Sequence, residues 1–261
     1  MATYRLIEFA ELDSTNCYAC ANLGRLAHGD VIQALVQTAG RGRWQRPWVS
    51  HVPGNLCLSF VLKPAGNPAR LPLASLSQLL AVCVCRVLDT YGVKATLKWP
   101  NDIQVDGRKI AGILAETAVQ GSEFLGLVLG IGVNLNLNDA TLVTIDQPAT
   151  SLNLVLGRAV AVTPFRDSLA GEFMNSYRAL LETGFPLIRG EYLGRCAFIG
   201  SEVEVRHAQE TLRGCARDVN AEGELVLLRE DGELRTVSHG EMFPNLRGGL
   251  ESARRHPGLP L

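Results

Sequence analysis

Long hydrophobic runs are absent from this chain of 261 residues. No stretch reaches the roughly 18 to 20 consecutive apolar residues that a membrane-spanning helix needs. The N-terminal segment also lacks the basic region followed by an apolar region that marks a secretory signal peptide. These absences exclude a helical membrane protein and a secreted protein, so we expect a cytoplasmic protein without a membrane partner.

The chain has no excess of either charge. Its 25 lysines and arginines stand against 26 aspartates and glutamates, which leaves a formal net charge of -1. Binding along a phosphate backbone requires a basic surface of substantial size. We therefore predict that the protein has no nucleic-acid partner.

Cysteine and histidine are too scattered to predict a disulfide framework or a metal cluster. The seven cysteines are an odd number, and the five histidines are dispersed along the chain. Cys17 and Cys20 have the spacing of a redox motif, but no second pair or suitably spaced histidine completes a zinc site. We interpret the cysteines as reduced, structural residues.

Hydrophobic residues make up 47% of the chain, enough for one large domain with a small appendage. Apolar patterning predicts strands at residues 4–12, 31–37, 55–62, 95–99, 103–105, 110–119 and 124–133. The last four are separated by short turns and should form an antiparallel run. Helices are predicted from the capping side chains at 13–16 to about Leu26, and at 71–91, 163–184 and 186–195.

The pattern changes after residue 197. Short alternating runs at 202–206, 211–219, 224–229 and 234–238 predict a small C-terminal β-barrel. We therefore expect a main domain at residues 1–195, a second domain at 196–246 and a flexible tail at 247–261.

Residues 38–48, here called the arginine loop, carry the first indication of function. Gly40 and Gly42 allow the backbone to approach a ligand closely. Arg41, Arg43 and Arg46 are permanently charged, bidentate donors. Such a loop can clamp phosphate or carboxylate groups, although a solvated surface turn has the same composition.

Two further segments carry polar residues that can meet the same ligand. Residues 98–103 contain Asn101 and Asp102, and residues 107–114 contain Lys109. With the arginine loop they favour a nucleotide-handling enzyme, because cations, amides and carboxylates bind phosphates and their metal ion. Without the other segments, Lys109 could equally be a solvent-exposed lysine that follows the turn at Asp106 and Gly107.

Five short motifs occur in order along the chain. They are Asp-Ser-Thr-Asn at 13–16, Gln-Thr-Ala-Gly-Arg-Gly-Arg at 37–43, Lys-Trp-Pro-Asn-Asp at 98–102, Gly-Arg-Lys-Ile-Ala-Gly-Ile-Leu at 107–114 and Gly-Ile-Gly-Val-Asn-Leu-Asn at 130–136. In this order they closely resemble the motifs of biotin protein ligases, over about residues 5 to 245. The resemblance implies an α+β catalytic domain like that of class II aminoacyl-tRNA synthetases, with a mixed or antiparallel sheet and flanking helices, followed by an SH3-like β-barrel.

The resemblance also implies a reaction in two steps. Biotin and MgATP form biotinyl-5′-AMP and pyrophosphate, and a lysine of a biotin carboxyl carrier domain of a carboxylase then takes the biotinyl group as an amide. ATP and biotin are thus the expected substrates, Mg²⁺ the expected metal ion, and the carrier domain the expected partner. Some family members form homodimers through an edge strand. Members that repress transcription carry an N-terminal helix-turn-helix, whereas only about a dozen residues precede Asp13 here, so we expect the ligase-only type.

Residues that match the family motifs inherit expected roles. Three are expected to be catalytic: Arg43, Lys109 and Asp102. Those expected at biotin are Ser14, Thr15, Asn16, Gln37, Gly40, Arg41, Arg43, Lys109, Gly112, Gly130 and Gly132. Those expected at ATP are Arg43, Arg46, Trp48, Asn101, Lys109 and Asn134, and those expected at the metal ion are Asn101 and Asp102.

The chemistry of the reaction agrees with these residue types. Adenylation brings a carboxylate up to an α-phosphate, so cations such as Arg43 and Lys109 must hold two anions together. The ureido ring of biotin needs both hydrogen-bond donors and acceptors, which Ser14, Thr15 and Gln37 can supply. Ser14 and Thr15 can also cap a helix, and the two roles are compatible.

The arginine loop departs from the family pattern. Trp44 and Gln45 stand where family members have a basic or small residue followed by glycine, and Pro47 precedes Trp48. The loss of glycine and the gain of proline should stiffen the loop. Residues 145–151, where the family has a segment over adenine, contain no aromatic side chain.

Three other functions fit parts of the pattern. A lipoate or octanoate transferase of the same fold would use an acyl chain, but the Gly-Arg-Gly-Arg and Lys-Trp-Pro-Asn-Asp motifs favour biotin. A non-catalytic biotin sensor would be indicated by loss of Arg43 or Lys109, and both are present. A transcriptional repressor would need the DNA-binding segment.

Overall fold

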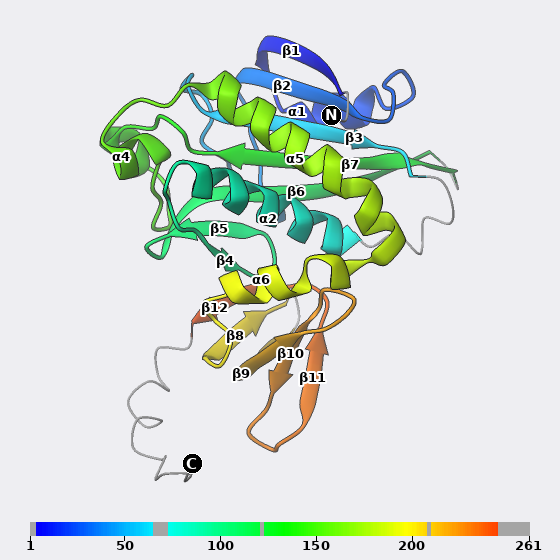
Figure 1. Ribbon diagram of the computed structural model, residues 1–261, viewed down its shortest axis with the longest axis vertical. Coiled ribbons are helices and arrows are strands. Elements are labelled where there is room, and N and C mark those ends of the chain that lie inside the picture. The colour runs from blue at the N-terminus through cyan, green and yellow to red at the C-terminus, as the bar shows by residue number, and fades with distance from the viewer. Residues whose placement is uncertain (1–3, 65–72, 121–122, 208–209, 245–261) are drawn as a thin grey trace.

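The computed structural model describes residues 4–64, 73–120, 123–207 and 210–244. The chain forms a seven-stranded sheet covered by helices and a five-stranded sheet near its C-terminal end (Figure 1). No helix within these ranges is both long and apolar enough to cross a membrane. The predicted tail at 247–261 lies outside the described residues.

The large sheet is built from residues 5–133, in the strand order β1-β2-β3-β7-β6-β5-β4. Its strands are β1 (Arg5–Leu12), β2 (Asp30–Gln37), β3 (Leu56–Leu62), β4 (Thr96–Lys98), β5 (Asp102–Val105), β6 (Arg108–Gln120) and β7 (Glu123–Val133). β4 to β7 pair antiparallel, as predicted. β1 and β2 pair parallel, which the local pattern of the sequence does not reveal.

Helices lie between and after these strands along the chain. The described α-helices are α1 (Thr15–Ala21), α2 (Leu73–Thr90), α3 (Asp139–Leu142), α4 (Leu152–Leu156), α5 (Val162–Thr183) and α6 (Arg189–Arg195). The predictions correspond to α1, α2, α5 and α6, whereas α3 and α4 are too short for a periodic pattern to show. The predicted extension of α1 to Leu26 is wrong. The helix ends at Ala21 because Asn22 turns back, and its side-chain Nδ2 donates to the Tyr18 carbonyl over 2.9 Å.

The large sheet is apolar on both faces. In β3, Phe60 and Leu62 belong to the larger hydrophobic cluster, whereas Val61 between them belongs to a smaller one. Successive residues of a strand point to opposite faces, so each face packs its own core. α2 and α5 lie side by side over the larger core, as Figure 1 shows, and α1 packs on the smaller core.

The smaller sheet is open and antiparallel, in the order β11-β10-β9-β8-β12. Its strands are β8 (Glu202–Arg206), β9 (Thr211–Val219), β10 (Leu225–Leu228), β11 (Leu234–Val237) and β12 (Glu241–Pro244). The predicted small β-barrel is present as a sheet that does not close, because β11 and β12 remain two separate edges in the described part of the chain. Strand patterning predicts strands but not closure, which depends on strand tilt and stagger.

Several contacts join the smaller sheet to the rest of the molecule. Gln78 of α2 donates its Nε2–H to the Gly223 carbonyl over 2.7 Å, and the Trp99 indole N–H lies 3.4 Å from the same oxygen. At the other side, the Lys98 ammonium lies 5.4 Å from the centre of the Phe243 ring. β12, which carries Phe243 and was absent from the sequence prediction, therefore lies beside β4 of the large sheet.

Candidate active site

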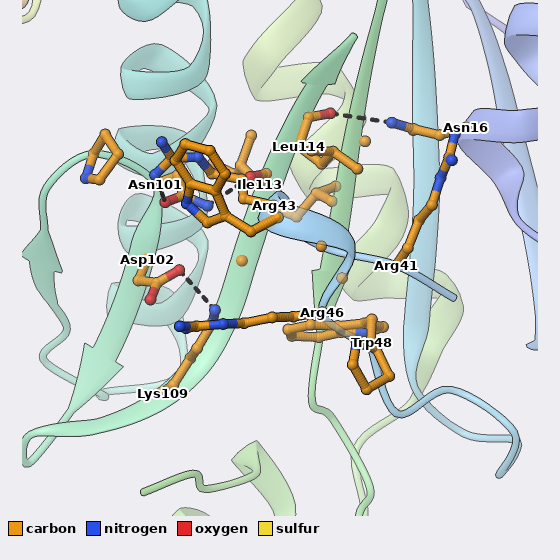
Figure 2. A pocket seen from close by; sticks show the side chains of 18 of the residues that line it. Asn16, Arg41, Arg43, Arg46, Trp48, Asn101, Asp102, Lys109, Ile113 and Leu114 are labelled. Atoms are coloured by element: carbon orange, nitrogen blue, oxygen red, sulfur yellow. Dashed lines mark hydrogen bonds and ion pairs between the residues drawn. The ribbon is translucent and has the colours of Figure 1, made fainter. Parts of the chain in front are cut away.

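A cavity of about 100 Å³ lies where the arginine loop crosses the large sheet. All residues predicted to bind biotin, ATP or metal line it, except Gly40 and Asn134. The lining also includes residues to which the sequence analysis gave no ligand, namely Gly42, Trp44, Pro47, Leu58, Lys98, Trp99, Pro100, Ile113, Leu114, Ile131, Gln147, Glu241 and Met242. In Figure 2, Asn16 and Arg41 lie on one side of this space, and Asp102 and Lys109 lie on the other.

One end of the cavity is lined by neutral hydrogen-bonding groups. Ser14 caps α1 by accepting from the Cys17 N–H over 3.4 Å, which confirms the predicted capping. The Gln37 Oε1 accepts from the Thr15 backbone N–H at 2.9 Å and lies 3.1 Å from the Thr15 hydroxyl. Ser59, a polar residue in the otherwise apolar strand β3, lies 2.8 Å from the Thr15 hydroxyl. A single serine in an otherwise apolar strand was the sequence signal that could have indicated a hydrogen-bonding role for Ser59.

Asn16 also lies at this end of the cavity, and Arg41 lies beside it with its charge balanced by Glu116. The Asn16 amide nitrogen donates to the Leu114 carbonyl at 3.2 Å, an interaction drawn in Figure 2, and to Glu116 at 2.7 Å. Arg41 forms an ion pair with the same Glu116 carboxylate at 3.0 Å. The Asn16 amide lies directly over Gly130, where a β-carbon would overlap it.

Two other glycines open space along the sheet. A β-carbon at Gly132 would overlap the Trp48 indole, and one at Gly112 would lie 3.1 Å from the Lys109 ammonium nitrogen. Paired strands β6 and β7 place Gly112 directly opposite Gly132. The sequence prediction that these positions need to lack a side chain therefore agrees with the packing.

The other end of the cavity holds charged groups. The Lys109 ammonium pairs with the Asp102 carboxylate at 2.7 Å, and each side chain is only 15% exposed. Lys109 is therefore not the solvated turn lysine that its spacing allowed. Asn101 beside them donates to the Ile113 carbonyl at 2.8 Å and accepts from Arg43 at 3.3 Å.

Arg43 is a partly buried cation next to this pair. Its guanidinium also donates to the Gly240 carbonyl over 2.9 Å. Burial lowers the pKa of Arg43, while the Asp102 and Glu241 carboxylates oppose that shift. An arginine remains protonated even so, and a partly desolvated cation attracts an anion more strongly than one in water.

Arg46 reaches the C-terminal sheet. Its two Nη atoms lie 2.5 Å and 2.8 Å from the two Glu241 carboxylate oxygens, and its side chain is 49% exposed. β12 thus forms one wall of the cavity, through Glu241 and Met242. Because β12 is 195 residues from Arg46 along the chain, no local pattern could have indicated this contact.

The arginine loop folds back on itself. The Trp48 N–H donates to the Gly40 carbonyl and the Gly42 N–H to the Arg46 carbonyl, each over 2.8 Å. At its tip, Trp44 and Gln45 both adopt φ of 58°, a left-handed conformation that favours glycine. The family glycine that Gln45 replaces would fit this conformation without a β-carbon penalty.

Trp48 carries its indole into the cavity. The Lys109 ammonium lies 5.6 Å from the indole ring centre. The indole N–H is buried without a hydrogen-bond partner among the described residues. In Figure 2 the Trp48 and Arg46 side chains both lie below the label of Arg43.

Gly40 and Asn134 lie just outside the cavity. A β-carbon at Gly40 would collide with Ser50 and the Trp48 carbonyl, so glycine is needed there for the loop to close on itself. Asn134 is buried and donates its Nδ2–H to the Thr150 carbonyl over 3.0 Å. Thr150 in turn donates its N–H to the Lys109 carbonyl over 2.9 Å, so Asn134 supports the strand that carries Lys109.

The described residues contain no group of three or more His, Cys, Asp or Glu side chains that could hold a metal ion. The two residues predicted at the metal offer one carboxylate, from Asp102, and one amide oxygen, from Asn101. Magnesium commonly takes one or two protein oxygens and completes its shell with phosphates and water. The pair fits a metal that arrives with a nucleotide, rather than one held by the protein alone.

Comparisons with known proteins agree with this geometry. Residues 8–134 match the Biotin/lipoate A/B protein ligase family, and residues 198–243 match the Biotin protein ligase C terminal domain. The chain is 34% identical over 243 residues to the biotin--[acetyl-CoA-carboxylase] ligase of Paracoccus denitrificans, covering 90% of this chain and 98% of that protein. It is 31% identical over 236 residues to the bifunctional ligase/repressor BirA of Salmonella typhimurium, covering 88% of this chain and 71% of that protein.

A solved structure gives the same result. The biotin protein ligase from Aquifex aeolicus in complex with biotin and ATP superposes with a TM-score of 0.80 at 25% sequence identity, over 92% of this chain and 99% of that chain. The predicted α+β fold is thereby confirmed, with the open C-terminal sheet as the correction. Two family matches, close relatives and a shared fold all agree with the five motifs, and the chain therefore belongs to the biotin protein ligase family of enzymes.

Proposed function

We propose that the protein biotinylates a carrier protein in two steps. Biotin and MgATP form biotinyl-5′-AMP and pyrophosphate, and the biotinyl group then passes to a lysine of a biotin carboxyl carrier domain. The observation that carries this proposal is the cavity, where neutral hydrogen-bonding groups at one end face cations at the other. A ureido ring and a phosphate require these two different environments. The Paracoccus relative, a ligase named for acetyl-CoA carboxylase, supports a carboxylase as the source of the acceptor.

Biotin binding is assigned to the neutral end. Ser14, Thr15 and Gln37 have hydroxyl and amide groups that can donate to and accept from the ureido ring. Gly112, Gly130 and Gly132 leave room along the sheet for the thiophane ring and acyl chain. This orientation directs the carboxylate of biotin toward the charged end.

Adenylation is assigned to the charged end. A carboxylate oxygen of biotin attacks the α-phosphorus, the new C–O–P linkage forms, and the bond to pyrophosphate breaks. Negative charge grows on the phosphate and the leaving group, and Arg43 and Lys109 are the cations near enough to balance it. Asn101 accepts from Arg43 and neighbours Asp102, the partner of Lys109, so both cations line the same end of the cavity.

Metal binding would involve Asp102 and Asn101. Mg²⁺ bound with ATP supplies charge neutralisation on the phosphates. The protein residues contribute oxygen ligands and hold Lys109 in place. Arg46 is assigned to the pyrophosphate, and Trp48 to the nucleotide, as side chains of the loop that covers the cavity.

Transfer requires an amine near the acyl carbon. The amine nitrogen of the acceptor lysine attacks this carbon, AMP leaves, and an amide forms with loss of one amine proton. Asp102, one of the two carboxylates that line the cavity, can orient the incoming amine.

The arginine loop must move before substrates bind. A cavity of about 100 Å³ is smaller than the roughly 300 Å³ or more that ligand sites usually enclose. The Trp48 indole occupies part of the missing space. We therefore assign to the loop an outward movement for binding and a return that covers the adenylate.

Three wider assignments belong to this proposal. We assign the catalytic unit to residues 1–195 and the C-terminal unit to 196–246, in agreement with the two family matches. We place the protein in the cytoplasm, which agrees with its free cysteines. Self-association through edge strand β1 or β4 is a third expectation, measurable by sedimentation velocity.

The decisive experiment is biotin-dependent exchange of labelled pyrophosphate into ATP. Purified protein with Mg²⁺ should catalyse exchange with biotin but not with octanoate or lipoate, and Lys109→Ala should abolish it. Exchange with lipoate or octanoate instead would identify the related acyltransferase. Biotin binding without exchange would identify a sensor. Transfer is then measured with a carrier domain, whose acceptor lysine is replaced in the control.

A further inference from the structure

Glu116 lies outside the cavity but contacts two of the residues that line it. It is a residue of β6. One oxygen accepts from the Asn16 Nδ2 at 2.7 Å, and the other pairs with the Arg41 Nη2 at 3.0 Å. A single carboxylate therefore joins α1, the large sheet and the arginine loop.

Glu116 fixes the orientation of the Asn16 amide. The nitrogen and oxygen ends of an amide have nearly the same shape, so their hydrogen-bond partners decide which way it lies. A carboxylate can only accept, and so can the Leu114 carbonyl 3.2 Å away. The Nδ2 end must therefore lie toward Glu116, and the Oδ1 end toward Ser59, whose hydroxyl lies 2.5 Å from it.

This orientation decides the direction of the next hydrogen bonds. Contacts of 2.5, 2.8 and 3.1 Å join Asn16 to Ser59, Ser59 to Thr15, and Thr15 to Gln37. Each hydroxyl has one proton, so two protons must serve three contacts when Asn16 presents its oxygen. Ser59 donates over the shortest contact, to Asn16. The Thr15 hydroxyl is within hydrogen-bond distance of both Gln37 and Ser59, and we assign its single proton to the shorter contact, with Ser59.

The consequence reaches Gln37, which lines the cavity. Its Oε1 then accepts only from the Thr15 backbone N–H and keeps a second lone pair for a ligand. If the Asn16 amide were reversed, Asn16 would donate to Ser59, Ser59 to Thr15, and Thr15 to Gln37. In that arrangement the Thr15 hydroxyl would occupy the second lone pair of the Gln37 Oε1 and leave none for a ligand.

We infer that Glu116 is a positioning residue that sets the direction of this hydrogen-bond chain and thereby presents Gln37 as an acceptor to the N–H groups of the ureido ring. The inference rests on the proposed function. It deepens that function by assigning part of the specificity for a ureido ring to a charge outside the cavity. An acyl chain without N–H groups gains nothing from such an acceptor.

Glu116→Gln tests this inference, because both neighbours of Glu116 are donors. The amide oxygen of the variant can accept from either Asn16 or Arg41, and the amide N–H₂ then faces the remaining donor. Either Arg41 loses its partner or Asn16 reverses. We expect the Kd for biotin, measured by calorimetry without ATP, to rise about tenfold, the effect of one hydrogen bond to a buried group. The kcat of pyrophosphate exchange at saturating biotin should change less than about threefold, because the charged end is untouched.

A double-mutant cycle separates positioning from general support. Thr15→Val removes the hydroxyl that would fill Gln37, so Glu116→Gln should weaken biotin binding less in that background than in the wild type. A purely structural role of Glu116 would give additive effects on the Kd. Glu116→Asp keeps the charge and should recover part of the affinity.

Two further variants complete the experiment. Ser59→Ala breaks the chain from β3 without touching Glu116 or Arg41, and it should weaken biotin binding even if Glu116→Gln fails to fold. Glu204→Gln removes a carboxylate that pairs with two arginines on the C-terminal sheet and should leave the Kd unchanged. An unchanged Kd in Glu116→Gln and Ser59→Ala, or strict additivity with Thr15→Val, would overturn the inference. Absence of biotin binding by the wild type would instead refute the proposed function.

Discussion

The Trp48 indole lies against Gly132, at a distance that leaves no room for a β-carbon. Gly132 is on β7, and Trp48 ends the arginine loop, so the contact joins the loop to the centre of the large sheet. The closed position of the loop therefore depends on one residue without a side chain. This relationship leads directly to a test of loop closure.

Gly132→Ala should prevent the observed closure. The added methyl group must displace the indole or the strand, and overpacking of this kind usually lowers the free energy of unfolding by about 1–3 kcal/mol. The KM for biotin in pyrophosphate exchange should rise as well. Gly190→Ala is the matched control, since nothing lies within 4 Å of a β-carbon at that helical position. Equal behaviour of the two variants would contradict the assigned packing.

Glu241→Gln should free Arg46. In the structure the Glu241 carboxylate accepts from both Nη atoms of Arg46, the two donors with which an arginine binds a phosphate. We expect the KM for ATP to fall about threefold to tenfold, and the Kd for biotin to stay constant. Stability should hardly change, because the Arg46 side chain is half-exposed. An increase in the KM for ATP would mean that Glu241 positions Arg46 for the nucleotide instead of competing with it.

Gln45→Gly should stabilise the protein. A left-handed conformation costs a residue with a β-carbon about 1–2 kcal/mol, and the greater freedom of glycine in the unfolded chain offsets about half of this. The expected gain in the free energy of unfolding is about 0.5–1 kcal/mol in urea titrations. Gln45→Ala retains the β-carbon and should show no such gain. Equal stability of the two variants would mean that the φ of 58° is not strained.

Stability should depend on the protonation of His28. Burial lowers the pKa of His28 from its ordinary 6.5, and its Nδ1 accepts from the Lys63 N–H at 3.0 Å. The unfolded chain therefore takes up the proton first as the pH falls. The contribution of His28 is complete above about pH 6.5 and is lost as the pH falls from there through the lower pKa of the folded state.

Urea unfolding at several pH values between 5 and 8 measures this effect. His28→Asn keeps a hydrogen-bond acceptor but does not titrate in this range. The difference in unfolding free energy between wild type and variant should be constant above pH 7 and should shift against the wild type below pH 6.5. A difference that does not vary with pH would rule out the assigned shift.

Much of the site could be predicted because its residues are grouped in short motifs. Arg43 is far from Asp102 and Lys109 along the chain, yet each stands in a segment whose composition indicates ligand binding. The strands at 110–119 and 124–133 were predictable because alternation and turn residues are local properties. The structure brings nearly all of these segments to one cavity.

Other features depend on contacts that no local pattern records. Glu116 looked like an ordinary strand residue, and only the packing of α1 on the sheet joins it and Ser59 to Asn16. The parallel pairing of β1 with β2 and the open C-terminal sheet likewise depend on how strands meet.

By itself, the sequence determined the order of the elements, the family and the chemical types of residue at the site, since periodicity and motif spacing are carried by neighbouring residues. Only the tertiary structure decided that Glu241 meets Arg46, that Trp48 fills the space over Gly132, and that Glu116 directs Asn16. These contacts join residues far apart in the chain, and their geometry follows from the packing of whole elements.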